Sequence, residues 1–203
     1  MIYEQLEIEV KRRIGNISPA MASKVPVLLD LAVKRIQQEG NFTFLENSYD
    51  FTTVANSNAG ITLPSDYRDF YGLRCLTAAY EKRLEPVDLE ELESKVVDIY
   101  DTGIAKYFYV WGGKLFTYAV DDAARSYRLR YYMRLPTFIQ GALPGTPGEF
   151  DEAIILYAVY TASLDIEDNS FTQGILADFE RSIRRMRRLY LVKPLQMSRI
   201  RYG

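Results

Sequence analysis

The 203-residue chain has no histidine and a single cysteine, Cys75, and its aromatic residues are almost all Tyr or Phe, with one Trp. Without histidine it cannot form a Ser-His-Asp or Cys-His catalytic unit, an imidazole general base or a His-ligated metal site. One cysteine excludes a disulfide within the chain and a Cys-rich zinc site. We expect Cys75, inside a predicted strand, to be a small buried apolar residue.

Long uncharged segments are also scarce. Near the C-terminus the longest, Ala153–Leu164, is about half of the roughly 20 residues that a bilayer-spanning helix needs. The N-terminal stretch MIYEQLEIEVKRR is amphipathic and contains acidic residues, unlike a secretory signal. With 48 % hydrophobic and 26 % charged residues, the composition is that of an ordinary soluble globular protein with no membrane partner.

Carboxylates are the remaining catalytic or metal-binding material, but turns and helix ends account for most of them. Glu93-Ser94-Lys95 matches half of a metal-dependent nuclease motif, yet it falls in a predicted helix instead of a strand. Gly112-Gly113-Lys114 lacks the spacing of a phosphate-binding loop. We therefore predict no catalytic residue, metal or cofactor. The other acidic groups considered are Asp121-Asp122, between two strands, and Glu149, Asp151, Glu152, Asp165, Glu167 and Asp168, at helix ends.

Charge is distributed unevenly along the chain. Residues 181–203 contain no acid and carry +8, from Lys193 and seven arginines. The rest has 17 basic and 27 acidic residues, a charge of −10. Such a basic end favours an acidic partner, either protein or nucleic acid, but it is also compatible with a solvated helix that offsets the acidic body. The arginines on the predicted outer face of the last helix are Arg181, Arg184, Arg185 and Arg188.

Apolar residues at helical spacing predict helices at both ends of the chain. The first ends at Gly15-Asn16, and the second begins near Pro26, which is acceptable in a first turn. The helix that starts near residue 150 is apolar nearly all round, so we expect it to lie between neighbours. The predicted helices cover residues 2–14, 26–39, 150–167 and 171–192.

Residues 42–134 are rich in short β-type runs. Glu81-Lys82 and Gly112-Gly113 occupy positions of two-residue hairpin turns. Apolar and polar side chains alternate over residues 126–134, which predicts a strand with one solvated face. One helix, with Asp88 at its N-cap, interrupts the strands. The predicted strands are 42–45, 50–54, 70–80, 83–87, 106–111, 114–118 and 126–133.

This order of elements predicts an α+β fold, because strands and helices do not alternate one for one. We expect a helical bundle made of the N- and C-terminal helices, a β-rich insertion containing one helix, a hinge loop rich in Pro and Gly, and an extended C-terminal tail. Their residues are 1–41 with 149–192, 42–134, 135–148 and 193–203, respectively.

The chain resembles the head–tail connector, or adaptor, proteins of tailed bacteriophages, a group related to tail tubular protein A. The resemblance spans nearly the whole chain, depends on the order and spacing of its stretches, and leaves residues 42–60 unmatched. The matching stretches are VKRRIGN, MASKVPVLLDLAVKRIQQE, LPSDYRDFYGLR, KYFYVWGGKLFTY, RLRYYMRLPTF, EFDEAIILYAVYTASLDIEDN and the Arg-rich final helix.

The resemblance implies a non-enzymatic virion protein at the phage neck, assembled in the host cytoplasm. It implies a twelve-fold ring of identical copies below the portal protein. This ring would contact the next tail component. It would also extend the channel, through which DNA passes without specific binding. The surplus of Tyr suits the lateral contacts of such a ring. The tail would then bind the portal through Lys193, Leu195, Met197, Arg199, Ile200, Arg201 and Tyr202, with Arg181, Arg184, Arg185 and Arg188 as a second basic surface.

Two other classes of function stay open at this point. One is a carboxylate-metal-dependent DNA-processing enzyme, although its motif halves fall on the wrong elements. The other is a small nucleic-acid-binding module, supported by the basic end but not by the acidic remainder, because phosphate binding requires a continuous basic face.

Overall fold

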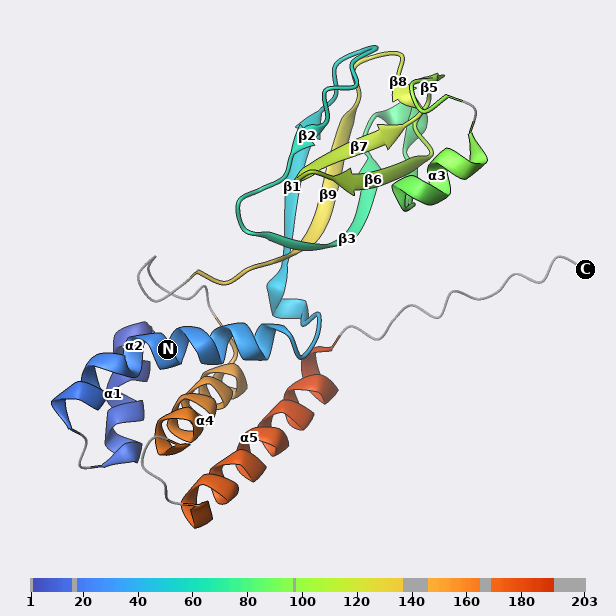
Figure 1. Cartoon of the computed structure of the whole chain (residues 1–203). Helices are drawn as coiled ribbons and strands as arrows, with labels where there is room; N and C mark the ends of the chain where they lie inside the picture. The colour runs from blue at the N-terminus through green and yellow to red at the C-terminus, as the bar shows by residue number, and fades with distance from the viewer. Residues whose placement is uncertain (1, 16–17, 97, 137–145, 165–168, 192–203) are drawn as a thin grey trace, which may run out of the picture. The chain divides into compact units, whose positions relative to one another are not determined.

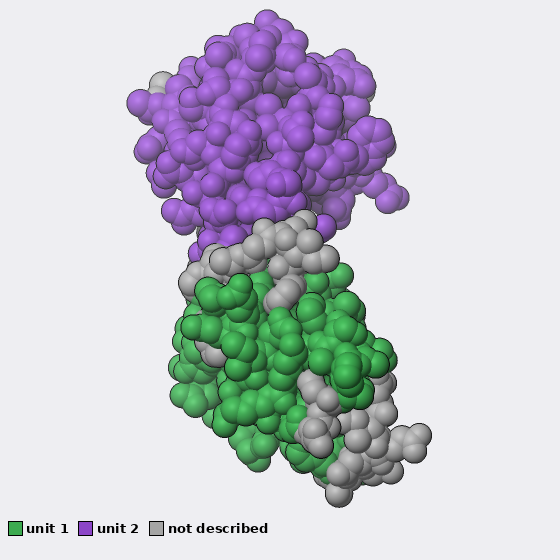
Figure 2. All heavy atoms as spheres, turned by 90° about the vertical axis from the view of Figure 1, so that its left-hand side faces the viewer, with its two compact units in different colours: residues 1–45, 135–203 green, residues 46–134 purple. Residues whose placement is uncertain are grey.

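The chain divides into two compact units, which Figure 2 colours separately. Unit 1 contains residues 1–45 and 135–203, and unit 2 contains residues 46–134. Helices of both chain ends form unit 1 and the strands lie in unit 2 (Figure 1), which confirms the predicted α+β class. The computed structural model describes residues 2–15, 18–96, 98–136, 146–164 and 169–191.

Unit 1 is organised around one central helix, α4. This helix contacts α1, α2 and α5, and Phe150, Ile154 and Ala158 on it are fully buried. The near-uniform apolar character of α4 therefore reflects burial on several sides, as the sequence predicts. The helices of the unit are α1 (Tyr3–Ile14), α2 (Pro19–Gln37), α4 (Gly148–Leu164) and α5 (Asn169–Tyr190).

The start of α2 differs from the prediction. The helix begins at Pro19, not near Pro26, and Pro26 lies inside it. The Ser18 side chain accepts a hydrogen bond from the backbone N–H of Met21 at 3.2 Å. Ser at the N-cap followed by Pro at the first helical position is a strong helix start, and this signal outweighs the loss of one backbone donor at Pro26.

Unit 2 is built on a seven-stranded mixed sheet in the order β1-β9-β3-β4-β6-β7-β2. Neighbouring strands are antiparallel except β4 and β6, which are parallel. The short strands β5 and β8 form a separate parallel pair, and α3 packs against β6. The elements are β1 (Glu46–Thr52), β2 (Ile61–Thr62), β3 (Tyr67–Cys75), β4 (Arg83–Pro86), α3 (Leu89–Lys95), β5 (Thr102–Gly103), β6 (Tyr107–Trp111), β7 (Lys114–Tyr118), β8 (Val120–Asp121) and β9 (Ser126–Met133).

One face of the sheet forms the core of unit 2. Along β9, buried Tyr127, Leu129 and Tyr131 alternate with exposed Arg128 and Arg130. This alternation confirms the predicted strand with one solvated face as far as Tyr131, whereas Tyr132, expected on that face, is buried. Cys75 is also buried in this core, as predicted.

Three predicted β features are wrong. Residues 43–45 form a short 3-10 helix, η1, instead of a strand. The ring of Phe44 packs edge-on against Phe150 at 5.0 Å, so this aromatic run fills the helical core. The strand predicted over 70–80 ends at Cys75 instead, and Glu81-Lys82 is not a two-residue hairpin, because β3 and β4 are joined by a longer connection that contains the 3-10 helix η2 (Ala78–Tyr80).

The hairpin at Gly112-Gly113 is confirmed, since Trp111 pairs with Lys114 and both glycines have positive φ, 57° and 74°. Two-residue turns of this type need that backbone conformation. Most of the predicted hinge loop and all of the predicted tail, 137–145 and 193–203, lie outside the described residues.

Candidate interaction surface

The exposed face of α5 carries the arginines singled out in the sequence. Phe179, Ile183 and Met186 are buried against unit 1, whereas Arg181, Arg184, Arg185 and Arg188 are all exposed. The 3.6-residue period of the helix produces this separation, because the two sets lie on opposite sides of its axis.

Most of these arginines already have acidic partners. Arg181 contacts Asp178 at 2.6 Å and Arg184 contacts Glu180 at 3.7 Å, both on α5 itself. Arg185 reaches Glu149 on α4 at 3.3 Å. Of this set only Arg188 has no ion pair with any acidic residue that the structure describes. The face is therefore less basic than its sequence suggests.

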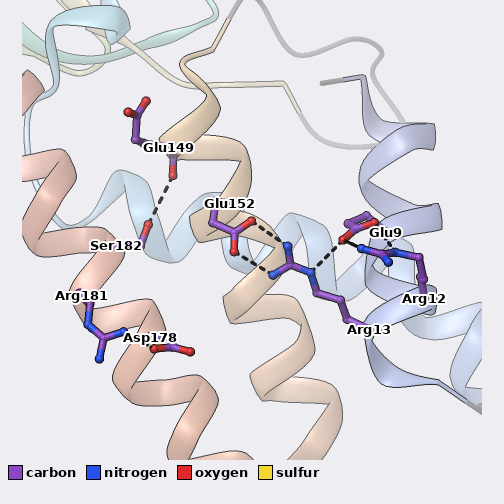
Figure 3. Close-up of polar contacts among 8 residues, drawn as sticks. All are labelled: Glu9, Arg12, Arg13, Glu149, Glu152, Asp178, Arg181 and Ser182. Atoms are coloured by element: carbon purple, nitrogen blue, oxygen red, sulfur yellow. Dashed lines mark hydrogen bonds and ion pairs between the residues drawn. The ribbon is translucent and has the colours of Figure 1, made fainter.

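A second charged network joins α1 to α4 (Figure 3). The guanidinium of Arg13 donates to both carboxylate oxygens of Glu152, at 2.8 and 2.9 Å, in a forked arrangement. Arg13 also donates one hydrogen bond to Glu9, at 2.9 Å. Arg12 donates two hydrogen bonds to Glu9, at 2.8 and 2.6 Å. Forked Arg–carboxylate contacts fix direction as well as distance, so this network orients α1 against α4.

These hydrogen bonds shift the pKa values of the groups involved. The hydrogen bonds from Arg12 and then Arg13 lower the pKa of the half-buried Glu9 carboxyl to about 2. The hydrogen bond to Glu152 raises the pKa of Arg13 above its ordinary value. Burial, and then its hydrogen bond to Glu149, raises the pKa of the Tyr190 phenol.

Between α1, α4 and α5 lies an open groove of about 600 Å³. Its charged side chains are three arginines and three acids, and Ser182 donates to the backbone carbonyl of Glu149 at 3.5 Å (Figure 3). These groups hold one another, which suits an orienting surface between helices and not a substrate site. The lining residues are Arg13, Gly148, Glu149, Glu152, Leu156, Asp178, Arg181, Ser182 and Arg185.

The other carboxylates considered in the sequence have structural surroundings wherever they are described, whereas Asp165, Glu167 and Asp168 lie outside the described residues. Asp121 is buried on β8 and accepts a hydrogen bond from Arg125 at 3.0 Å. Asp151 is buried at the start of α4 and accepts from Thr146 at 3.0 Å. Glu93 lies on α3 and is exposed, as the sequence predicts. Among the described residues no three His, Cys, Asp or Glu side chains gather as metal ligands would.

The sequence prediction missed a basic surface in unit 2. Arg128 and Arg130 on β9 lie beside Arg74 on β3 and Arg83 on β4 around one hollow, and we call these four residues the sheet arginine cluster. Two of the four arginines could be found from the sequence, because Arg128 and Arg130 alternate with apolar residues along the predicted strand. The other half depends on strand register, which local sequence patterns do not provide.

The predicted portal-binding residues are not part of the described structure: Lys193, Leu195, Met197, Arg199, Ile200, Arg201 and Tyr202 all lie beyond residue 191. Within the described part of the chain, no helix is both long enough and apolar enough to span a bilayer.

The family model described as SU10 adaptor protein matches residues 1–199. No curated protein matches the chain.

Proposed function

The chain belongs to the SU10 adaptor protein family, and from this premise we propose that it forms a ring between the portal and the tail of a phage. Family membership makes it a structural adaptor and a virion component. The ring would contain twelve copies, as the resemblance to head–tail connectors implies, and would extend the DNA channel at the neck. Assembly would take place in the host cytoplasm, with the next tail component bound on the side away from the portal.

The match over residues 1–199 carries this proposal, because it covers both units. The distribution of surface charge supports it. In unit 1 the arginines of α1 and α5 are largely paired with acids of the same unit, so the described helices of unit 1 offer no continuous basic face for phosphate groups. DNA would therefore pass without specific binding, as a channel requires.

For portal attachment we propose the C-terminal segment from Lys193 to Gly203. Leu195, Met197 and Ile200 would fill apolar pockets, while Arg199 and Arg201 would meet carboxylates or carbonyls through forked hydrogen bonds. The α5 arginines are the second basic surface, but three of them would first have to leave their present partners.

Imaging of the chain mixed with its portal tests this function. We expect a closed ring on the portal whose particle images average with twelve-fold symmetry, and lateral interfaces of about 1,000 Å² or more between copies. The chain without portal, imaged at the same concentration, is the control. A chain that stays unattached to portal at high concentration and moderate salt contradicts the proposal.

We also propose that the chain has no enzymatic activity. Incubation with Mg²⁺ or Mn²⁺ and either plasmid DNA or nucleotide should give no turnover above a heat-treated control. Glu93→Gln and Asp122→Asn are the variants to compare, because both side chains are exposed. Metal-dependent nicking that either variant abolishes would establish the DNA-processing alternative, and salt-sensitive DNA retention would favour a nucleic-acid-binding module.

A further inference from the structure

The sheet arginine cluster places like charges directly opposite one another. Arg74 on β3 pairs in register with Arg128 on β9 and with Arg83 on β4, and Arg130 is the next outward residue along β9. All four side chains are exposed. Like charges directly opposite across strands destabilise a sheet, so the fold alone gives no reason for this arrangement.

Acidic neighbours neutralise only part of the cluster. Asp50 accepts two hydrogen bonds from Arg128, at 2.8 and 2.7 Å, and Glu81 contacts Arg74 at 3.3 Å. Arg83 donates to the backbone carbonyl of Tyr71, and Arg130 has no ion pair with a described acidic residue. Four arginines and two carboxylates leave the surface with two positive charges.

The cluster surrounds a hollow of about 470 Å³. Gly72 makes room in it, since a Cβ at that position would lie 3.3 Å from the Nε and Nη2 atoms of Arg83. A glycine in a strand often marks a place where another group approaches closely, and here Arg83 lies across it. The remaining lining residues are Tyr71, Leu73, Arg74, Leu76, Glu81, Arg128 and Arg130.

The same unit carries a surface of opposite charge. Residues 88–101 contain six acids and one lysine, a charge of −5. Asp88, Glu90, Glu93 and Asp101 are exposed. The helix α3, at the centre of this segment, packs against β6, which neighbours β4 but carries none of the four arginines. We call residues 88–101 the acidic segment.

We propose that the sheet arginine cluster docks the acidic segment of a second copy of the chain. Two different surfaces that complement each other give a head-to-tail contact, which closes into a ring when the rotation permits. A short acidic protein segment suits the cluster better than a DNA backbone does, because the cluster has a surplus of only two positive charges in one hollow, whereas DNA binding requires a continuous basic face. The inference deepens the proposed ring by naming one lateral contact, but it does not depend on the portal.

Charge reversal in the full-length chain tests this contact, with self-association measured by sedimentation at low and moderate salt. We expect Arg83→Glu with Arg130→Glu, and separately Glu90→Lys with Glu93→Lys, to weaken association about tenfold or more. The chain with all four changes should recover most of the loss, because each surface then meets its new opposite. Arg188→Glu is the matched control, an exposed arginine on α5 whose reversal should leave association unchanged.

Three results would overturn the contact: a wild-type chain that stays monomeric at high concentration and low salt, a cluster variant that associates like wild type, or four changes that fail to restore association. If Arg83→Glu with Arg130→Glu abolishes DNA retention but leaves self-association intact, the cluster binds nucleic acid and not a second copy of the chain. Portal attachment is measured separately. A chain that self-associates through this contact but does not attach to portal would contradict the proposed function and leave the contact standing.

Discussion

At the scale of single residues, a buried polar network of unit 2 surrounds Asp121. Its carboxylate accepts hydrogen bonds from Arg125 at 3.0 Å, Thr53 at 2.7 Å and Tyr127 at 2.8 Å. Asp121 is 2 % exposed and Arg125 is 4 % exposed. The guanidinium of Arg125 also lies 4.9 Å from the ring centre of Tyr80. Buried charges with this many partners hold β8 to its neighbours.

Removing Asp121 should destabilise the chain strongly, because a buried arginine would lose its buried partner. We expect Asp121→Ala to lower the free energy of unfolding by about 3 kcal/mol, measured by urea denaturation. Asp50→Ala is the control: its pair with Arg128 is exposed, and the expected loss is below about 1 kcal/mol. Equal losses for the two variants would show that the buried network adds no more than a surface pair.

Glu9 should titrate at unusually low pH. Its folded pKa, about 2, lies below the ordinary value of about 4.3. The ionised Glu9 carboxylate therefore contributes its full stabilisation above about pH 4.3, and this stabilisation is lost as the pH falls toward 2. Carbon-detected NMR of the carboxyl group measures this pKa directly. Arg12→Gln and Arg13→Gln should each raise it, whereas Arg35→Gln, on α2, should not. Titration of Glu9 near its ordinary value in the intact chain contradicts the α1 network.

At the scale of elements, the sequence predicts what local patterns determine. Periodicity located α1, α4 and α5 to within a few residues, and alternation located β9. The pattern was insufficient where tertiary packing decides, as at η1, where the ring of Phe44 packs against Phe150. The same division applies to sites: the arginines of one helix were visible in the sequence, while the sheet arginine cluster required the register of three strands.

The start of α2 gives a prediction at this scale. Ser18→Ala removes the acceptor for the N–H of Met21 and should cost about 1 kcal/mol of unfolding free energy. The control is Ser23→Ala inside the same helix, where the hydroxyl donates to the carbonyl of Ala20 at 2.8 Å. That change should be neutral or slightly stabilising, because Ala favours the helix interior. A Ser18→Ala chain as stable as wild type would mean that the cap does not set the start of α2.

At the scale of the whole molecule, the residues through which an adaptor binds its partners should differ from the residues that stabilise its core. Unit 1 illustrates this: α5 ends at Tyr190, and its buried residues Phe179, Ile183 and Met186 all precede that point. The proposed portal-binding segment begins only at Lys193. Stability and attachment should therefore respond to different parts of the chain.

Deletion of residues 194–203 separates the two properties. We expect the melting temperature to stay nearly unchanged and portal attachment to weaken severely, because the apolar anchors and both tail arginines are lost together. Arg199→Glu with Arg201→Glu should cause most of the same loss. Arg184→Glu with Arg188→Glu is the matched charge control and should have a smaller effect, since Arg184 already has Glu180 as a partner. If the truncated chain attaches as tightly as the intact one, portal docking belongs to the α5 arginines, and this pair of charge reversals would then abolish it.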